Sequence, residues 1–306
     1  MRQFLDLVRS YTPLPLRKKI GPIIGYVTFF LRVHVRGKSW EPKVLSALET
    51  LKKIKDGHLS AIRFGDGEIS LIEGGDLQFQ KYETELGKRL SNILTTNMPK
   101  LLICIPPIFG NLRKLTKIGY WFEIHHLFRY SHVWQRLTSP NRTYGDAFFA
   151  RAYLTYKDKS GAGKVYTEIK LLWENEDVVI IEGSKSRLGV GNDLFKSARS
   201  LGRILCPPEN AYAKVDAIIK EASQLPQETL ILLSLGPAAK VIGYELFKRG
   251  YRIIDVGHLD MEYEMYLRNS VTQIAVPYKY FNEIGARNPE DCTDPAYLSE
   301  IIAEIT

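Results

Sequence analysis

The sequence has few cysteines and no hydrophobic run long enough to cross a membrane. Its three cysteines, Cys104, Cys206 and Cys292, stand far apart and form no CxxC pair, which argues against a disulfide-bonded secreted domain. Cys104 lies in an apolar run, where a free cysteine is usually a small buried hydrophobe. No cleavable signal pattern opens the chain. These absences favour a location in the reducing cytoplasm.

Acidic residues are almost missing from the first 38 positions. This segment holds eight Lys or Arg against a single Asp, and it therefore carries +7 of the formal net charge of +8. The rest of the chain is nearly neutral, which argues against a nucleic-acid-binding module, because such a surface needs clustered cations. The apolar stretch 20–31 is shorter than the about 20 residues that span a bilayer. Residues 1–38 fit either a peripheral contact with anionic lipid, at the inner face of the plasma membrane, or a segment packed on the main domain.

Residues 39–306 are expected to form one globular domain, since the chain has 45% hydrophobic and 25% charged residues. Short apolar runs alternate with longer amphipathic stretches, which is typical of an α/β fold with a mostly parallel sheet flanked by helices. Residues 109–156 lack this rhythm, so we expect a helical insertion there. Strands are expected at 59–64, 101–105, 178–182, 203–206, 230–235 and 252–256, and helices at 82–96, 164–173, 193–200, 212–223 and 238–248.

Two carboxylates follow the first expected strand, in the motif Arg63-Phe64-Gly65-Asp66-Gly67-Glu68. Open α/β sheets bind their ligands at the carboxyl ends of the strands. Asp66 and Glu68, separated by one glycine on a turn, can face one point, and carboxylate oxygens suit Mg²⁺ or Mn²⁺ bridging a diphosphate. Gly65 allows a tight turn and a close approach of the ligand. A solvated acidic turn would have a similar sequence, so the motif alone leaves both interpretations open.

The second motif is a glycine-rich, basic loop between residues 182 and 195. It follows an expected buried strand and is predicted to enter a helix, where backbone amides and the planar Arg187 side chain would form a phosphate cradle. The pattern matches neither the Walker motif nor the dinucleotide motif GxGxxG. An ordinary surface loop is the alternative. The residues expected to bind the ligand here are Gly183, Ser184, Arg187, Gly189, Asn192 and Asp193.

Two further strand ends carry candidate residues. Gly236 precedes Pro237, which suits the first turn of a helix, and this turn could present amides to a nucleotide or simply start the helix. A dense group of titratable residues follows the last expected strand and consists of His258, Asp260, Glu262 and Glu264. Such side chains act as metal ligands and as general bases. A solvated acidic helix start is the alternative.

In combination, these motifs resemble the GT-D fold glycosyltransferases, a bacterial family. The resemblance rests on the segments 63–68, 181–195, 234–240 and 255–264. It implies a Rossmann-like core, a UDP-sugar donor and a Mn²⁺ (or Mg²⁺) cofactor at a DxE motif, which maps onto Asp66 and Glu68. The glycine-rich loop would correspond to the donor-binding loop, with Arg63, Gly65 and Gly236 as further donor-binding candidates. The last segment would supply the acceptor side and the catalytic base.

The expected function is metal-dependent transfer of a hexose from a UDP-sugar to a saccharide acceptor, in the synthesis of a bacterial surface glycan or glycoprotein. The resemblance favours glucose, and the basic N-terminus favours a lipid-linked acceptor. The metal and Arg187 would offset charge on the departing UDP. An acidic residue of 260–264 would deprotonate the acceptor hydroxyl, so inversion is preferred over retention. A nucleotidyl- or phosphotransferase is the main alternative, because a metal and a diphosphate cradle serve those reactions too.

Overall fold

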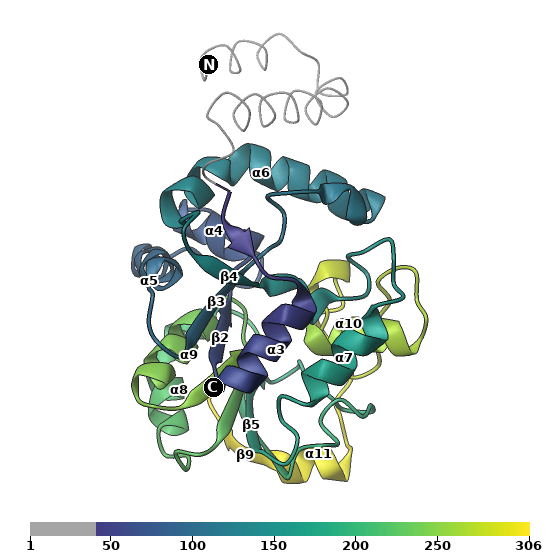
Figure 1. Ribbon diagram of the computed structural model, residues 1–306. Coiled ribbons are helices and arrows are strands. Elements are labelled where there is room, and N and C mark those ends of the chain that lie inside the picture. Colours follow the sequence, from purple (N-terminus) through teal and green to yellow (C-terminus); the bar gives the residue numbers. More distant parts are fainter. Residues whose placement is uncertain (1–40) are drawn as a thin grey trace.

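The fold is one sheet of nine parallel strands with helices on both faces (Figure 1). The computed structural model describes residues 41–306, so the predictions for 1–38 lie outside the described residues. The order across the sheet is β1-β4-β3-β2-β8-β7-β5-β6-β9. The strands are β1 (Lys43–Val44), β2 (Ser60–Arg63), β3 (Leu101–Ile105), β4 (Thr143–Asp146), β5 (Asp177–Gly183), β6 (Ser200–Cys206), β7 (Leu230–Ser234), β8 (Arg252–Asp255) and β9 (Ile301–Glu304).

Side chains of each strand alternate between two hydrophobic cores, one on either face of the sheet. In β2, Ile62 packs into one core and Ala61 into the other, as the two-residue repeat of a strand requires. The first core is covered by α4 (Asp66–Ile72), α5 (Thr84–Thr95), α6 (Lys117–Leu137), α8 (Val215–Ala222) and α9 (Ala238–Lys248). The second is covered by α3 (Ala47–Gly57), α7 (Ala162–Lys170) and α10 (Leu259–Leu267). The remaining helices are α11 (Pro295–Glu300) beside β6 and β9, and the 3₁₀ helices η2 (Leu112–Lys114), η3 (Ala147–Arg151), η4 (Ala211–Lys214) and η5 (Asn282–Ile284).

The α/β class and the parallel sheet expected from the sequence are confirmed. All six expected strands are present as β2, β3, β5, β6, β7 and β8, because strands covered on both faces consist of recognisable apolar runs. The strands that were not predicted give a weaker signal. β1 and β9 lie at the sheet edges, and β4 has the sequence Thr-Tyr-Gly-Asp, with no apolar run.

Two expectations differ from the structure. Residues 109–156 contain the long helix α6, yet they are no insertion, because α6 is the crossover from β3 to β4, and β4 pairs with β3 and β1. The helix expected at 193–200 is wrong, since these residues form turns that lead directly into β6. There the Asn192 Oδ1 atom accepts a hydrogen bond from the Leu194 amide at 3.0 Å, and such side-chain bonds compete with helix formation.

The sheet has a topological switch point between its neighbouring strands β2 and β8, whose residues Ala61 and Ile254 are paired. β2 leads into α4 on one face of the sheet, whereas β8 leads into α10 on the other. The two connections therefore diverge beyond the carboxyl ends of these strands, and we refer to the region between them as the crevice. In open α/β sheets this is where ligands bind, and both the 63–68 motif and the 255–264 segment lie there.

Gly145 in β4 provides a test of the packing between β4, β3 and α3. A Cβ atom at this position would lie 2.4 Å from Cys104 Sγ and 3.0 Å from side-chain atoms of Leu102 and Thr50. We expect Gly145→Ala to lower the free energy of unfolding by about 1–3 kcal/mol through overpacking, as measured by urea denaturation. Gly110→Ala is the control, because a Cβ atom there meets nothing within 4 Å. Equal stability of both variants would contradict this packing.

Candidate active site

A buried lysine joins the two strands of the switch point. Lys240 Nζ, on α9, lies 3.0 Å from Asp255 Oδ2 at the end of β8 and 3.1 Å from Glu68 Oε1 on α4. It also donates to the Gly236 carbonyl at 3.2 Å. All three charged side chains are at least nine-tenths buried. Burial alone would raise the pKa of Asp255, but Lys240 and Arg63 hold this pKa below its ordinary value, so the carboxylate is ionised.

Arg63 completes this network from β2. Its Nε donates to the Asp255 carbonyl at 2.8 Å, its Nη1 donates to the Ala147 carbonyl at 3.0 Å, and its Nη2 lies 3.3 Å from Asp255 Oδ1. Gly257 makes room for it, because a Cβ atom there would lie 1.9 Å from Arg63 Nη2. Arg63 was predicted to bind the donor, and in the structure its guanidinium group ties β2 to β8 and η3.

The two acids of the 63–68 motif have different environments. Glu68 Oε2 accepts the Gly65 amide at 2.8 Å, which is the capping-box arrangement at the start of α4, and its other oxygen faces Lys240. Asp66, the first residue of α4, is instead exposed to solvent. The surrounding protein atoms displace water from around the carboxyl group and so raise the pKa of Asp66, and the positive charge of Arg151 opposes this rise. The motif therefore offers one available carboxylate, that of Asp66.

A charged group surrounds Asp66 at the mouth of the crevice. Arg151, at the end of η3, forms an ion pair with Glu283. His258 Nε2 lies 3.8 Å from Glu283 Oε1. Burial, with the nearby Arg151 charge, lowers the pKa of His258 to about 4, so the imidazole is uncharged at neutral pH. His258 is thus a predicted catalytic residue that the structure brings together with Glu283 and Arg151.

A fourth acid approaches Asp66 from α6. Glu123 is only 8% exposed. Its burial, together with the charge of Asp66, raises the pKa of Glu123 to about 8, against the opposing influence of Arg151. This residue belongs to no recognisable sequence motif, because it is a single acid in a helix rich in aromatic residues.

The acids of α10 face the glycine-rich loop. Asp260 Oδ1 accepts the Gly189 amide at 2.9 Å and the Asn192 Nδ2 group at 2.8 Å, while Oδ2 lies 2.7 Å from Lys279 Nζ. Glu264 Oε1 also accepts from Asn192, at 2.7 Å, and from Lys279, at 3.0 Å. Both acids are buried. They therefore fix the loop onto α10, and the solvated acidic helix start that was weighed as an alternative is not what forms.

The last predicted catalytic acid, Glu262, is held by the backbone. Its Oε2 atom accepts the Leu154 amide at 2.9 Å, and the residue is 5% exposed. Burial raises the pKa of Glu262, and the charge of Arg151 opposes the rise. Glu262 thus holds the segment after η3, and it interacts electrostatically with Arg151 and Glu283 of the charged group around Asp66.

The glycine-rich loop is held from its other side by buried charges. Glu182 accepts the Leu188 amide at 2.8 Å and pairs with Arg203 at 2.5 Å. Arg187, with a left-handed φ of 53°, donates to the carbonyls of Tyr278 and Glu290 at 2.7 and 2.5 Å. The predicted phosphate fork is thus 6% exposed and turned toward the C-terminal segment. Since no helix follows the loop, the cradle that was expected at a helix start does not form there.

The other donor-binding candidates take varied positions. Asp193 accepts from Lys170 Nζ at 2.7 Å and from the Tyr263 hydroxyl at 2.6 Å, on the face of α10 and α7. Gly183 packs against Pro208, and Gly236 against Phe79. Ser184 is half-buried at the end of β5, where its amide donates to the Cys206 carbonyl at 2.9 Å. The structure brings Gly65 to the switch point beside Asp66.

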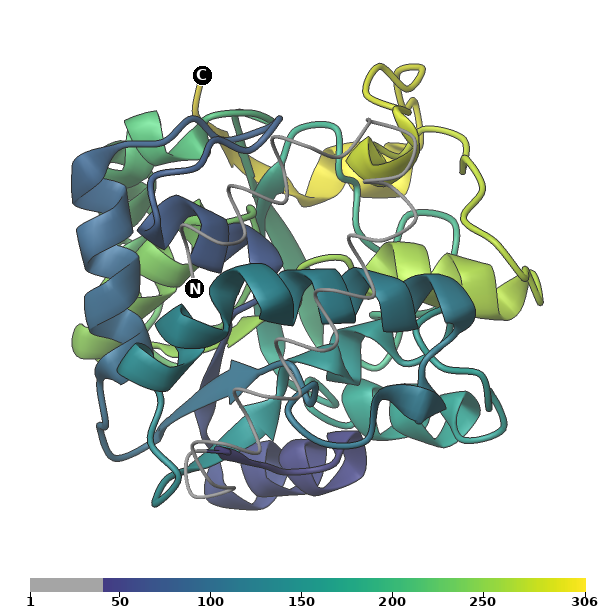
Figure 2. The same ribbon diagram turned by 90° about the horizontal axis from the view of Figure 1, so that it is seen from above.

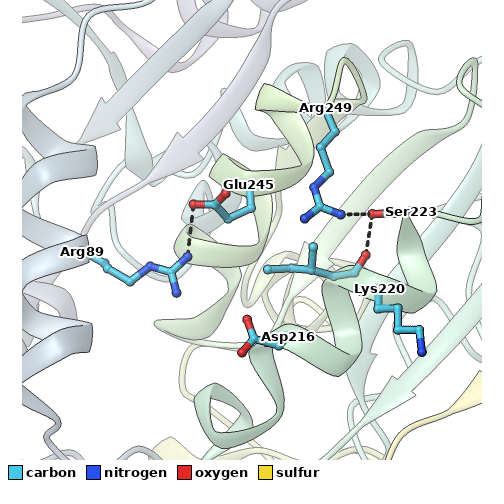
Figure 3. A pocket seen from close by; sticks show the side chains of 7 residues that line it. Arg89, Asp216, Lys220, Ser223, Glu245 and Arg249 are labelled. Carbon is cyan, nitrogen blue, oxygen red and sulfur yellow. Dashed lines mark hydrogen bonds and ion pairs between the residues drawn. The ribbon is translucent and has the colours of Figure 1, made fainter.

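A charged surface cavity of about 440 Å³ lies elsewhere, between α5, α8 and α9 (Figure 3). Arg89 and Glu245 pair across it at 3.1 Å, and Arg249 donates to Ser223 Oγ at 2.7 Å. Its lining residues Glu245 and Arg249 come from the end of α9, toward the amino ends of the strands. This cavity is therefore separate from the crevice at the carboxyl ends.

The crevice fits a divalent cation through Asp66 rather than through Asp66 and Glu68 together. Both Glu68 oxygens are engaged within the protein. Among residues 41–306, no group of three or more His, Cys, Asp or Glu is arranged to hold a metal. Mg²⁺ in nucleotide-using sites is usually held by one or two carboxylates, with substrate phosphates and water as its other ligands. The exposed Asp66 suits that mode of binding.

These features define a Rossmann-like α/β protein with a polar site at its switch point. The model of the glycosyltransferase GT-D fold family matches residues 61–284. The chain therefore belongs to the GT-D glycosyltransferase fold family.

Known relatives agree with this assignment. The chain is 37% identical over 268 residues to the probable glycosyl transferase Gly of Streptococcus gordonii, covering 86% of this chain and 39% of that protein. It is 36% identical to glycosyltransferase GlyD of Streptococcus pneumoniae serotype 4, covering 84% of this chain and 32% of that protein. The chain thus spans less than half the length of these relatives.

Solved structures match over their whole length. One, described as the domain of unknown function 1792 with a distinct glycosyltransferase fold, has a TM-score of 0.84 and 37% identity, covering 88% of this chain and 98% of that chain. Another, a glycosyltransferase with this domain from Streptococcus sanguinis, has a TM-score of 0.82 and 34% identity, covering 87% and 100%. The Rossmann-like core expected from the family resemblance is thereby confirmed.

The buried network can be tested at Lys240. Lys240→Met would leave Asp255 and Glu68 without their shared cation, so we expect a loss of about 3–5 kcal/mol in the free energy of unfolding at pH 7. In the wild type, the pKa of Asp255 is depressed. The ionised Asp255 therefore stabilises the fold fully at neutral pH, and this stabilisation is lost only as the pH falls through that pKa. In the variant, burial would raise the pKa of Asp255, and protonation would then relieve the buried charge.

The deficit of Lys240→Met should therefore shrink between pH 7 and pH 5, in urea unfolding measured at each pH. Lys248→Met is the control, since Lys248 forms an exposed surface pair with Glu245, worth at most about 1 kcal/mol. A loss in the free energy of unfolding that is no larger than that of Lys248→Met, or that grows as the pH is lowered, would contradict the buried network of Lys240, Asp255 and Glu68.

Proposed function

We propose that the protein transfers a hexose from a UDP-sugar to a saccharide acceptor, with a divalent cation, Mn²⁺ or Mg²⁺, at Asp66. The observation that carries the proposal is the exposed Asp66 carboxylate beside Arg151, at the switch point of a GT-D family fold. The names of the relatives support sugar transfer in general. The nucleotide, the sugar and the metal are our inference, and glucose remains the favoured sugar.

The residues of the crevice suggest how the reaction would proceed. A cation bound at Asp66 would offset the charge that develops on the departing diphosphate. We assign to Arg151 the role first predicted for Arg187, because Arg151 lies within electrostatic reach of Asp66, whereas Arg187 is bound to the backbone carbonyls of Tyr278 and Glu290. His258, uncharged at neutral pH, would accept the proton of the acceptor hydroxyl. Attack from the face opposite the diphosphate would invert the anomeric carbon.

The acceptor class follows from the same reasoning. A saccharide of a surface glycan or of a glycoprotein would be the substrate, and a lipid-linked saccharide is our preferred form. Nucleotidyl or phosphoryl transfer is the alternative, because an acidic cation site and a diphosphate suit those reactions as well. The products separate them, since sugar transfer releases UDP, and the others release pyrophosphate or a nucleotide diphosphate such as ADP.

Donor hydrolysis tests the proposal. Purified protein is incubated with a panel of UDP-sugars and other nucleotide sugars, with Mn²⁺ or with EDTA, and the released nucleotide is measured. We expect metal-dependent UDP release from one sugar, and a loss of at least about 100-fold for Asp66→Asn. Asp66→Asn should keep wild-type stability, because Asp66 is exposed.

Glu68→Gln serves as the comparison for this experiment. Glu68 caps α4 and faces Lys240, so this variant should lose stability in addition to activity. Wild-type turnover by Asp66→Asn, or no release of UDP from any sugar in the panel, would overturn the proposed function.

We further propose a peripheral contact with anionic lipid, at the inner face of the plasma membrane, through residues 1–38. In residues 41–306 none of the helices combines the length and the hydrophobicity needed to cross a bilayer. The described chain supports a surface contact at α6, which exposes Ile118 (83%), Phe122 (51%) and Trp121 (42%) on one side. Residues 106–145 carry six Lys or Arg and a single acid, a composition that favours anionic lipid.

Sedimentation with phosphatidylglycerol vesicles tests the lipid contact. Deletion of residues 1–36 should weaken binding by at least about tenfold, since each basic residue near the surface contributes about 1 kcal/mol. The triple change Ile118→Ser, Trp121→Ser and Phe122→Ser should also weaken it by at least about tenfold, since it removes apolar area that would be buried in the bilayer surface. The control is Val271→Ser, which changes an equally exposed apolar residue (84%) far from α6 in the sequence. Unchanged binding in the deletion variant would refute the role of residues 1–38.

A further inference from the structure

Glu123 is a buried acid without a partner. Its side chain is 8% exposed, and within residues 41–306 it takes part in no hydrogen bond or ion pair. Among residues 41–306, its carboxyl oxygens do not belong to the fully buried atoms that lack a partner, so the carboxyl group keeps some contact with solvent and is open to a ligand. The fold itself does not require this acid, because α6 packs through apolar residues before and after Glu123, such as Tyr120 and Ile124.

The contacts between α6 and α4 place Glu123 beside Asp66. Near the ends of the two helices, Arg136 Nη2 and His132 Nε2 lie 2.8 and 3.3 Å from the carboxylate oxygens of Glu73. Further back, the Tyr130 hydroxyl donates to Ser70 Oγ at 3.3 Å. The two helices therefore run in the same direction, side by side (Figures 1 and 2).

Following both helices from this contact toward their starts leads to the two acids. Asp66 lies one turn before Ser70, and Glu123 lies two turns before Tyr130 on the same side of α6, since seven residues complete about two turns. Independently, Asp66 and Arg151 both lie close enough to interact electrostatically with the Glu123 carboxyl group. Glu123 thus faces the crevice, at the mouth of which Asp66 is exposed.

From this geometry we propose that Glu123 is the second protein ligand of the divalent cation held at Asp66, in the position that the sequence motif suggested for Glu68. The inference rests on the proposed function for the presence of a cation there. A carboxylate from each of two helices suits a hard cation that takes its other ligands from phosphate and water.

Mn²⁺ binding without any nucleotide provides the test. Free Mn²⁺ is followed by electron paramagnetic resonance during titration of the full chain at pH 7.5. Glu123→Gln and Asp66→Asn should each raise the Kd by at least about tenfold, because even groups that only support metal ligands contribute 10–100-fold. Glu73→Gln is the matched control, since it removes an acid from the same pair of helices that is already bound to Arg136, and it should stay within about twofold of the wild type. Thermal unfolding of each variant checks that it is folded.

The outcomes separate this inference from the proposed function. Weakening by both Glu123→Gln and Asp66→Asn supports the two-carboxylate site. Weakening by Asp66→Asn alone would overturn the role of Glu123 and leave the proposed function intact. Equal Mn²⁺ affinity in the wild type and in both variants would overturn the inference as well. Metal-dependent donor hydrolysis by the same samples then shows independently whether sugar transfer is the reaction.

Discussion

The structure of the site depends on one buried cation. Lys240 stands between the end of β8 and the start of α4, and the two carboxylates that it contacts belong to segments nearly 190 residues apart in the chain. Arg63 adds a second cation that reaches the same Asp255 carboxylate from β2. Because an unpaired charge would be costly in this interior, the four side chains fix the relative positions of β2, β8, α4 and α9. They thereby hold in place the start of α4, which carries the exposed Asp66 carboxylate.

Much of the sheet could be predicted from the sequence, and much of the site could not. The six central strands consist of apolar runs whose length and spacing are visible without a structure. β4 was missed because its sequence, Thr-Tyr-Gly-Asp, contains no apolar run. The helix expected at 193–200 failed because Asn192 binds the backbone of its own loop, a local contact that periodicity cannot reveal. Spacing also suggested that Asp66 and Glu68 face one point, but Lys240, 172 residues further on, turns Glu68 inward.

The motifs near the crevice divide into supporting and exposed groups. The glycine-rich loop looks like a ligand cradle in the sequence because it is rich in glycine, hydroxyl groups and cations. In the structure, neighbouring residues already bind those groups. Asp260 accepts a hydrogen bond from the Gly189 amide, and Arg187 donates to the carbonyls of Tyr278 and Glu290. A motif rich in glycine and polar residues can therefore mark a segment that holds a site in place rather than the residues that would contact a ligand. Arg151 and Glu283, which no motif indicated, lie at the mouth because η3 and η5 bring them there.

The pairing of β2 with β8 has a consequence for how the chain folds. Each of the other neighbours of these strands lies much closer along the sequence, as β3 does to β2 and β7 does to β8. Contacts between distant parts of a chain form slowly, because the intervening loop must first be closed. Two half-sheets, β2 to β4 and β5 to β8, can each assemble from local crossovers before they meet. The crevice exists only after that meeting, so the switch point is among the last parts of the molecule to acquire its native form.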